Sequence, residues 1–213
     1  MEIELKYRVP DKETMEKIWK DRYFSDIEEK DTREDVLMRA AYFDTEDRIL
    51  SANDIAFRVR MEGGKTVASL KWNDKDISIR GLHMREEINV PINDDTCFIS
   101  PKPDIFKESA EGRDLLEVVG DSPLINILEM TFVRKRVRLD NEDCICELSL
   151  DEGKILCDNG EEPISEMEIE IFSGSQEDLL KIGDEIAAKY DLEPELRSKY
   201  SRGLSLLSAC EER

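Results

Sequence analysis

Charged residues that could bind a metal or an anion recur at every second position along several segments of the chain. In residues 1–9, Glu2, Glu4 and Lys6 alternate with apolar residues, so their side chains would share one face of a strand. Taken alone, this pattern is typical of a strand with one face in water. Five more segments repeat it, with polar residues at alternate positions: Arg58 and Arg60; Arg85 and Glu87; Arg134, Arg136 and Arg138; Glu147, Ser149 and Asp151; Glu166, Glu168 and Glu170.

The opposite faces of these six segments are mostly apolar and need a cover. If helices cover them on the outside, the charged faces line the interior of a sheet closed on itself. Guanidinium and ammonium groups are costly to bury unless they meet an anion, and carboxylates are costly to bury unless they hold a cation. A polyphosphate bound with Mg²⁺ or Mn²⁺ meets both requirements. The sequence therefore predicts a polar tunnel for this complex, and the lack of His and Cys clusters argues against zinc.

Eight strands are needed to place these side chains. Alternation predicts them at 1–9, 37–43, 55–61, 67–72, 85–90, 131–140, 144–151 and 166–172. Turn residues separate several of them: Gly63-Gly64, Asn141 and Asp151-Glu152-Gly153. The short connections predict an antiparallel sheet.

Three helices are predicted beside these strands, at 11–22, 104–119 and 175–190. Ser175, with Asp178 at the capping-box position, begins the last one, whereas Gly112 weakens the middle one. No repeat or linker divides the chain. We therefore predict one α+β domain over residues 1–213, a closed antiparallel eight-stranded β-barrel with helices packed outside.

Composition limits the partners. The 213 residues include 31 Lys and Arg against 51 Asp and Glu, a net charge of −20, which repels nucleic acid and anionic membranes. No stretch approaches the roughly 20 apolar residues of a membrane span, and residues 1–9 lack the apolar run of a signal peptide, so we expect a cytoplasmic protein. In that compartment we expect reduced thiols at all five cysteines: Cys97, Cys144, Cys146, Cys157 and Cys210.

An ordered series of motifs extends along the chain: Glu2-x-Glu4-x-Lys6, Tyr42-Phe43-Asp44-Thr45, Phe57-Arg58-x-Arg60, Leu70-Lys71, Gly81-Leu82-His83-x-Arg85-x-Glu87, Phe132-x-Arg134-x-Arg136, Glu147-x-x-Leu150-Asp151-x-Gly153, Ser165-Glu166-x-Glu168-x-Glu170 and Ser198-Lys199-x-x-Arg202-Gly203. The series resembles the CYTH superfamily of triphosphate tunnel metalloenzymes. That superfamily includes inorganic triphosphatases, thiamine triphosphatases and class IV adenylyl cyclases.

The resemblance implies roles for the charged residues. The implied ligands of Mg²⁺ or Mn²⁺ are Glu2, Glu4, Asp151, Glu168 and Glu170, and Glu87 would hold a second ion or the attacking water. The implied phosphate-binding residues are Lys6, Arg58, Arg60, Lys71, Arg85, Arg134, Arg136 and Lys199, with Arg138, Lys154 and Arg202 as weaker candidates. The implied catalytic residues are Glu4, Lys6, Glu87 and Glu170. The alternative for each cation is an ordinary salt bridge or a snorkelling surface side chain.

Within the superfamily, residues 81–87 and 150–170 look most similar to bacterial inorganic triphosphatases. This similarity implies hydrolysis of tripolyphosphate to pyrophosphate and phosphate, with nucleoside triphosphates and longer polyphosphate left open as substrates. A base or thiazole needs an apolar or aromatic recess beside the tunnel, and no such cluster is evident in the sequence.

Other functions stay open at this point. The fold would equally serve an adenylyl cyclase, a thiamine triphosphatase, or a nucleoside or RNA 5′-triphosphatase. A polyphosphate-binding module without catalysis is a further alternative, although it would gain nothing from six acids. Both a monomer and a homodimer are compatible with the sequence. His83, the single histidine, is expected in a loop with a structural or substrate-edge role.

Overall fold

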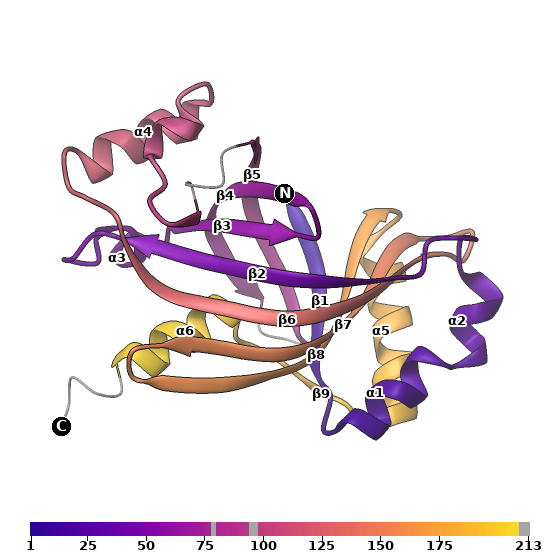
Figure 1. The fold of residues 1–213 in the computed structure, drawn as a ribbon. Coiled ribbons are helices and arrows are strands. Elements are labelled where there is room, and N and C mark those ends of the chain that lie inside the picture. The colour runs from indigo at the N-terminus through magenta and orange to yellow at the C-terminus, as the bar shows by residue number, and fades with distance from the viewer. Residues whose placement is uncertain (78–79, 94–97, 209–213) are drawn as a thin grey trace.

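Eight antiparallel strands close into a barrel in the computed structural model, which describes residues 1–77, 80–93 and 98–208 (Figure 1). The strands are β1 (Glu2–Arg8), β2 (Glu34–Asp44), β3 (Ala56–Glu62), β4 (Lys65–Ile77), β5 (Leu82–Ile92), β6 (Ile125–Asp140), β7 (Ile145–Cys157) and β8 (Gly160–Ser173). Their order is β5-β4-β3-β2-β6-β7-β8-β1, and β1 pairs with β5 to close the ring. The predicted eight-stranded barrel is therefore confirmed. A two-residue strand, β9 (Glu193–Pro194), adds to β1.

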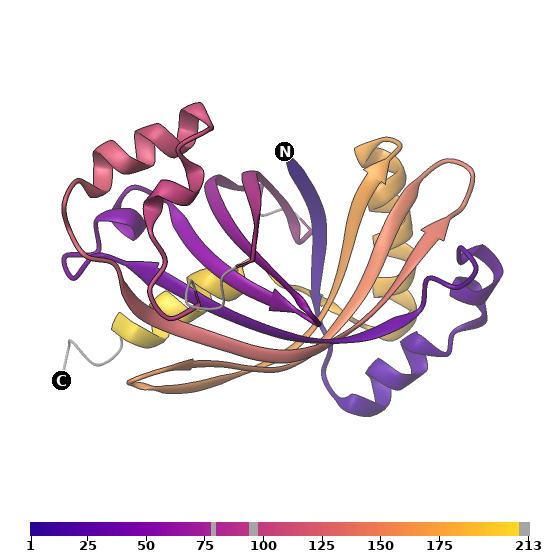
Figure 2. The same cartoon turned by 45° about the horizontal axis from the view of Figure 1, so that its top comes forward.

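Helices lie around this barrel at both of its ends (Figures 1 and 2). They are α1 (Lys12–Trp19), α2 (Arg22–Ile27), α3 (Ile49–Ala52), the 3₁₀ helix η2 (Pro103–Phe106), α4 (Ala110–Val119), α5 (Gln176–Tyr190) and α6 (Lys199–Ser208). Ser175 caps α5 as predicted, because its side chain accepts a hydrogen bond from the backbone of Asp178 while the Asp178 side chain accepts from that of Ser175. Among the described residues, no helix combines the length and hydropathy needed to span a bilayer.

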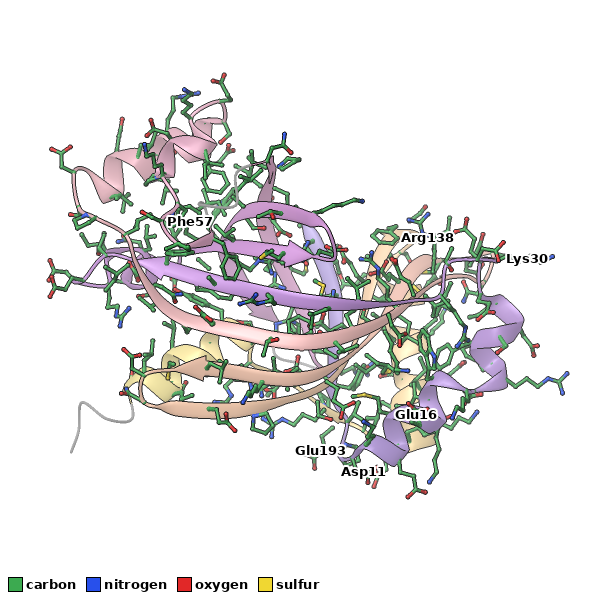
Figure 3. The ribbon with its side chains drawn as sticks, in the orientation of Figure 1. Asp11, Glu16, Lys30, Phe57, Arg138 and Glu193 are labelled. Atoms are coloured by element: carbon green, nitrogen blue, oxygen red, sulfur yellow. The ribbon has the colours of Figure 1, made fainter. Side chains whose placement is uncertain are left out.

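Two hydrophobic clusters join the outer face of the barrel to these helices. One packs β1, β6, β7 and β8 against α1, α2 and α5, and includes Leu5 and Tyr7. The other packs β2, β3 and β4 against α3, η2 and α4. In this second cluster Phe57 meets Phe106 edge to face, with ring centroids 5.3 Å apart (Figure 3). Because side chains alternate along each strand, this outer burial turns the charged positions inward.

A third cluster involves α6 and the apolar residues Met38, Met130 and Leu204. Gly203 lets α6 approach the sheet closely, since a Cβ at this position would lie 2.7 Å from a methyl carbon of Leu128. The sequence did not predict this helix. It also places Lys199 beside the interior of the barrel.

Several local predictions were wrong. The segment 151–153, predicted as a turn, lies inside β7, and the reversal comes after Cys157. His83, expected in a loop, is part of β5. The single helix predicted at 104–119 is divided into η2 and α4, with Ser109 capping α4 through the Gly112 amide. The Gly63-Gly64 hairpin turn is confirmed between β3 and β4.

Candidate active site

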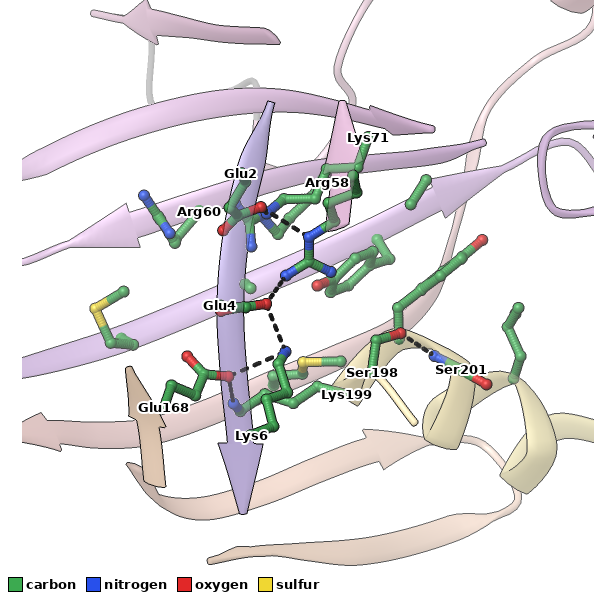
Figure 4. Close-up of a pocket in the computed structure, with 18 of the residues that line it drawn as sticks. Glu2, Glu4, Lys6, Arg58, Arg60, Lys71, Glu168, Ser198, Lys199 and Ser201 are labelled. Atoms are coloured by element: carbon green, nitrogen blue, oxygen red, sulfur yellow. Dashed lines mark hydrogen bonds and ion pairs between the residues drawn. The ribbon is translucent and has the colours of Figure 1, made fainter. Parts of the chain in front are cut away.

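A cavity of about 290 Å³ lies within the barrel and collects most of the predicted site residues (Figure 4). The predicted residues that line it are Glu2, Glu4, Lys6, Arg58, Arg60, Lys71, Arg85, Arg134, Glu168, Glu170 and Lys199. They come from β1, β3, β4, β5, β6, β8 and α6. The barrel therefore brings together side chains from the two ends and the middle of the sequence.

Ion pairs connect the charged residues of β1 with their neighbours (Figure 4). Lys6 Nζ lies 3.0 Å from Glu4 Oε1 and 3.1 Å from Glu168 Oε1. Arg85 Nε lies 2.7 Å from Glu2 Oε2, and a second nitrogen of Arg85 contacts Glu4. Glu2 and Glu4 are thus engaged by cations in this structure.

A second group of charges lies between β6, β7, β8 and α6. Arg134 donates to both carboxylate oxygens of Asp151, at 2.8 and 2.7 Å, and to Glu168 at 2.5 Å. Lys199 Nζ lies 2.9 Å from Asp151, 2.7 Å from Glu166 and 2.7 Å from Glu168. Burial opposes the ionisation of Glu168, but Lys199, Lys6 and Arg134 outweigh it and hold the pKa of Glu168 well below its ordinary value. All three carboxylates of this group are paired with cations, and Asp151 does not line the cavity.

Glu170 has a different environment. It lines the cavity opposite Glu4 in the β1–β8 pair, and no Lys or Arg among the described residues forms an ion pair with it. Burial, together with the negative charges of Glu2 and Glu4, raises the pKa of Glu170 to about 7. A cation at this position would offset the repulsion among these carboxylates and favour ionised Glu170.

The basic residues of β3 and β4 are destabilised in their charged forms by burial and by neighbouring positive charges. Burial and the neighbouring Arg58 lower the pKa of Arg60 to about 10. Burial, Arg85 and Arg58 lower the pKa of Lys71 to about 8. The Nε atoms of Arg58 and Arg60 are both buried without a hydrogen-bond partner, which costs roughly 1–3 kcal/mol each. An anion in the cavity would accept these donors.

The carboxylates of the cavity include possible ligands for a metal ion. Within residues 1–77, 80–93 and 98–208, no three His, Cys, Asp or Glu side chains are grouped as a ready-made site, and Arg85 pairs with both Glu2 and Glu4. Glu170, however, is a partly buried oxygen donor with an elevated pKa beside two further carboxylates, which suits a hard divalent ion. Glu2, Glu4 and Glu170 line the same cavity and fit a metal once Lys71 and Arg85 release Glu2 and Glu4. Asp151 and Glu168 are each held by both Lys199 and Arg134.

Two other predicted site residues lie outside the lining of the cavity. Glu87 Oε1 is 3.1 Å from Arg58 Nη2 and 3.1 Å from Lys71 Nζ, so it supports these cations. Arg136 pairs with Glu34, whose side chain is about half exposed, and with Glu62 at 2.6 Å. The role predicted for Glu87, holding a second ion or the attacking water, and the phosphate binding predicted for Arg136 would require these pairs to open.

The weaker candidates are also engaged elsewhere. Arg138 lies 3.6 Å from Glu29 at the end of the barrel near α2 (Figure 3). Lys154 forms an exposed pair with Glu161 at 2.8 Å. Arg202 contacts Glu162 at 2.7 Å and also reaches Glu166. These three side chains do not line the cavity.

His83, Cys144 and Cys146 are buried away from the cavity. His83 is buried, and its Nε2 lies 2.9 Å from the backbone oxygen of Glu195. Cys144 and Cys146 are buried thiols in the cluster under α5, and Cys157 is also a free thiol. Cys97 and Cys210 lie outside the described residues.

One wall of the cavity was missed by the sequence reasoning. It consists of apolar and aromatic side chains from β2, β6 and α6: Met38, Tyr42, Met130, Phe132, Tyr200 and Leu204. Tyr42 and Tyr200 stack with their ring centroids 4.9 Å apart. The alternation of Met38, Ala40 and Tyr42 in the sequence was the available signal, because these positions face the same interior as the charges of the other strands.

Comparison with known proteins agrees with the architecture. Residues 1–204 match the CYTH domain family. An inorganic triphosphatase of Haemophilus influenzae is 30% identical over 170 residues, which cover 78% of this chain and 44% of the relative. The chain thus spans less than half the length of this curated relative.

Solved structures show the same fold. A Hippeastrum protein, described as a putative adenylyl cyclase with a dominant triphosphatase activity, aligns over 96% of both chains with a TM-score of 0.69 and 20% identity. A putative adenylate cyclase of Bacillus halodurans aligns over 95% of this chain and 96% of its own, with a TM-score of 0.55 and 23% identity. Together with the match over residues 1–204, the closed barrel and its charged interior show that this chain belongs to the CYTH domain family.

Proposed function

We propose that this protein is a metal-dependent triphosphate hydrolase that converts inorganic tripolyphosphate to pyrophosphate and phosphate. One observation carries the proposal: the same cavity contains a carboxylate without an ion pair among the described residues, Glu170, and two arginines, Arg58 and Arg60, whose Nε donors have no hydrogen-bond partner. A polyphosphate bound with a divalent ion supplies both partners. The name of the Haemophilus relative, an inorganic triphosphatase, supports this choice of substrate.

Mg²⁺ or Mn²⁺ is the proposed cofactor, held by the carboxylates of Glu2, Glu4 and Glu170. When bound, the ion would supply Lewis-acid polarisation of phosphoryl oxygens. Substrate phosphate would compete with Glu2 and Glu4 for Lys71 and Arg85, because these cations are the present partners of the two carboxylates. Substrate and metal would therefore favour the binding of each other.

The basic residues bind and orient the phosphates in this mechanism. The Nε donors of Arg58 and Arg60 would bind oxygens of one phosphate, and Lys6 and Arg85, which also line the cavity, would stabilise charge on the leaving pyrophosphate. Water attacks the terminal phosphorus in line with the leaving oxygen, and no covalent intermediate is required. The protein contributes position and charge rather than a nucleophile.

A second candidate substrate class follows from the apolar wall. Phosphate oxygens gain no hydrogen bonds from Met38, Met130 or Leu204, so inorganic tripolyphosphate leaves this side of the cavity unused. A triphosphate that carries an organic ring would bury the ring there. Nucleoside triphosphates and thiamine triphosphate are therefore the second substrates to compare.

Phosphate release tests these proposals. Tripolyphosphate, pyrophosphate, ATP and thiamine triphosphate would each be assayed with Mg²⁺, Mn²⁺ or EDTA. We expect metal-dependent release, and Glu4→Gln should lower kcat/KM by about 100-fold or more because a buried charge facing the metal and Lys6 is lost. Circular dichroism would confirm that the variant is folded.

Glu86→Gln is the matched control, since Glu86 is an acid on β5 that does not line the cavity. An unaffected Glu4→Gln enzyme would remove Glu4 from the site. Tight polyphosphate binding without release from any substrate would indicate a binding module. Production of cyclic AMP and pyrophosphate from ATP would indicate a cyclase.

A further inference from the structure

Arg58 is held differently from Arg134 and Arg85, two other arginines that line the cavity. Arg134 and Arg85 each contact two carboxylates. Arg58 contacts one, Glu87, and shares it with Lys71. Less of the charge of Arg58 is therefore neutralised by the protein itself.

The remaining contact of Arg58 is with a neutral side chain. Arg58 Nη2 donates to Ser69 Oγ at 3.1 Å, and the Ser69 hydroxyl donates to Asn89 Oδ1 at 2.6 Å. The three residues stand opposite one another on β3, β4 and β5. Ser69 is completely buried, and its only side-chain partners among the described residues are Arg58 and Asn89.

This arrangement fixes one side of the guanidinium. Ser69 and Glu87 both bind Nη2 from the strands beside Arg58, each at 3.1 Å, whereas the buried Nε has no partner. A planar guanidinium held at Nη2 has a defined orientation, so the direction of its Nε donor is defined as well. A neutral acceptor achieves this without cancelling the positive charge that an anion would meet.

We propose that Ser69 and Asn89 are positioning residues for Arg58, which orient its guanidinium toward substrate phosphate while preserving its charge. Ser69 accepts the Nη2 hydrogen bond, and Asn89 fixes the Ser69 hydroxyl so that its lone pairs face Arg58. The inference rests on the proposed function, because it assigns a purpose to the free donor of Arg58.

A double-mutant cycle tests the inference. kcat/KM for tripolyphosphate would be measured for wild type, Ser69→Ala, Arg58→Ala and the double variant. Ser69→Ala should lower kcat/KM by about tenfold, mainly through a higher KM, because an interaction with substrate phosphate persists through the reaction. In the Arg58→Ala background the same change should have less than about a twofold effect, because the group that Ser69 orients is absent.

Asn89→Ala provides an independent arm, since Asn89 is exposed and its truncation leaves no buried cavity. It should raise KM in the same direction as Ser69→Ala, and the Ser69→Ala/Asn89→Ala pair should be no worse than Ser69→Ala alone. If Ser69→Ala fails to fold, Asn89→Ala combined with Arg58→Ala forms the cycle. Ser149→Ala is the matched control, because Ser149 is a buried serine of β7 whose side chain, within the described part of the chain, donates only to Glu147.

The outcomes separate the two proposals. Loss of activity by the same factor with and without Arg58 would show that Ser69 is merely structural, and would overturn the inference while leaving the proposed function intact. A wild-type protein that neither hydrolyses nor binds any triphosphate would overturn both. A tenfold loss of kcat/KM on Ser69→Ala that occurs only when Arg58 is present would establish the positioning role.

Discussion

Glu170 links the electrostatics of the cavity to the stability of the protein. Its pKa is raised from the ordinary value of 4.5 to about 7, so folding favours its protonated form. The stabilising contribution is fully present below pH 4.5 and is lost as the pH rises through 7, and it amounts to about 3 kcal/mol when the shift is converted at 1.36 kcal/mol per pH unit.

We therefore predict that Glu170→Gln is less sensitive to pH than wild type. Urea unfolding in EDTA at pH 5 and pH 8 should show wild type losing stability relative to the variant at the higher pH. Mg²⁺ at pH 8 should then stabilise wild type more than the variant, because the ionised carboxylate has a cation to bind. Parallel pH profiles for the two proteins would contradict this account of Glu170.

At the scale of elements, Gly112 lets α4 pack closely against η2. A Cβ at this position would lie 1.9 Å from the backbone oxygen of Phe106 in η2. A backbone atom cannot move aside as the end of a flexible side chain can. The segment predicted as one helix is divided between η2 and α4, and Gly112 permits the close approach of these two helices.

Gly112→Ala should destabilise the protein without altering the chemistry. The clash should cost about 1–3 kcal/mol and exceed the roughly 1 kcal/mol that alanine gains over glycine within a helix. Since α4 packs on the outer face of the barrel, kcat/KM of the folded protein should be unchanged. Thermal unfolding and steady-state kinetics measure the two effects. Glu117→Ala, an exposed change on α4, is the control, and a large kinetic defect in Gly112→Ala would contradict the separation.

The sequence predicted the strands better than the helices, for physical reasons. Alternating charge located β1 and β6 because one face of each is buried outside the barrel and the other meets the charged interior. It failed at Gly153, where a turn signal lies inside β7 because the small residue allows close contact with Phe132 on β6. The signal for a turn and the signal for close packing are the same residue type.

The sequence did not predict helix α6, because its residues give a weak local signal for a helix. Its sequence includes three serines and a glycine in ten residues, which gives a poor intrinsic helix propensity. Tertiary contacts compensate: Lys199 and Arg202 pair with buried acids, and Gly203 packs against Leu128. The alternating charges within each strand were enough to predict the charged site. The apolar wall could not be predicted in this way, because part of it comes from α6, whose position depends on tertiary contacts.

At the scale of the whole molecule, the charge of the interior opposes that of the rest of the chain. The net charge is −20, yet the cavity lining includes seven Lys and Arg side chains against five Asp and Glu. Most of the excess acidic charge therefore lies away from the site. Repulsion among these groups destabilises the compact state at low ionic strength.

Salt should therefore stabilise this protein. Raising NaCl from 0.01 to 0.15 M shortens the Debye length from about 30 to about 8 Å, which screens the exposed acids more than the buried ion pairs. The midpoint of thermal unfolding in EDTA should rise over this range. KCl should act equally, because the effect depends on ionic strength rather than on a bound ion. A falling midpoint would mean that attractive surface pairs outweigh the repulsion.

The closure of the barrel through β1 has a consequence for the order of folding during synthesis. β1 pairs on one side with β5 and on the other with β8, so Glu4 meets Glu170 only after nearly the whole described chain has been made. Until then β1 and the growing sheet present unpaired edges, which are open to aggregation. The same late event assembles the cavity, because β1 carries Glu2, Glu4 and Lys6. A nascent chain that stops before β8 is therefore both unclosed and inactive.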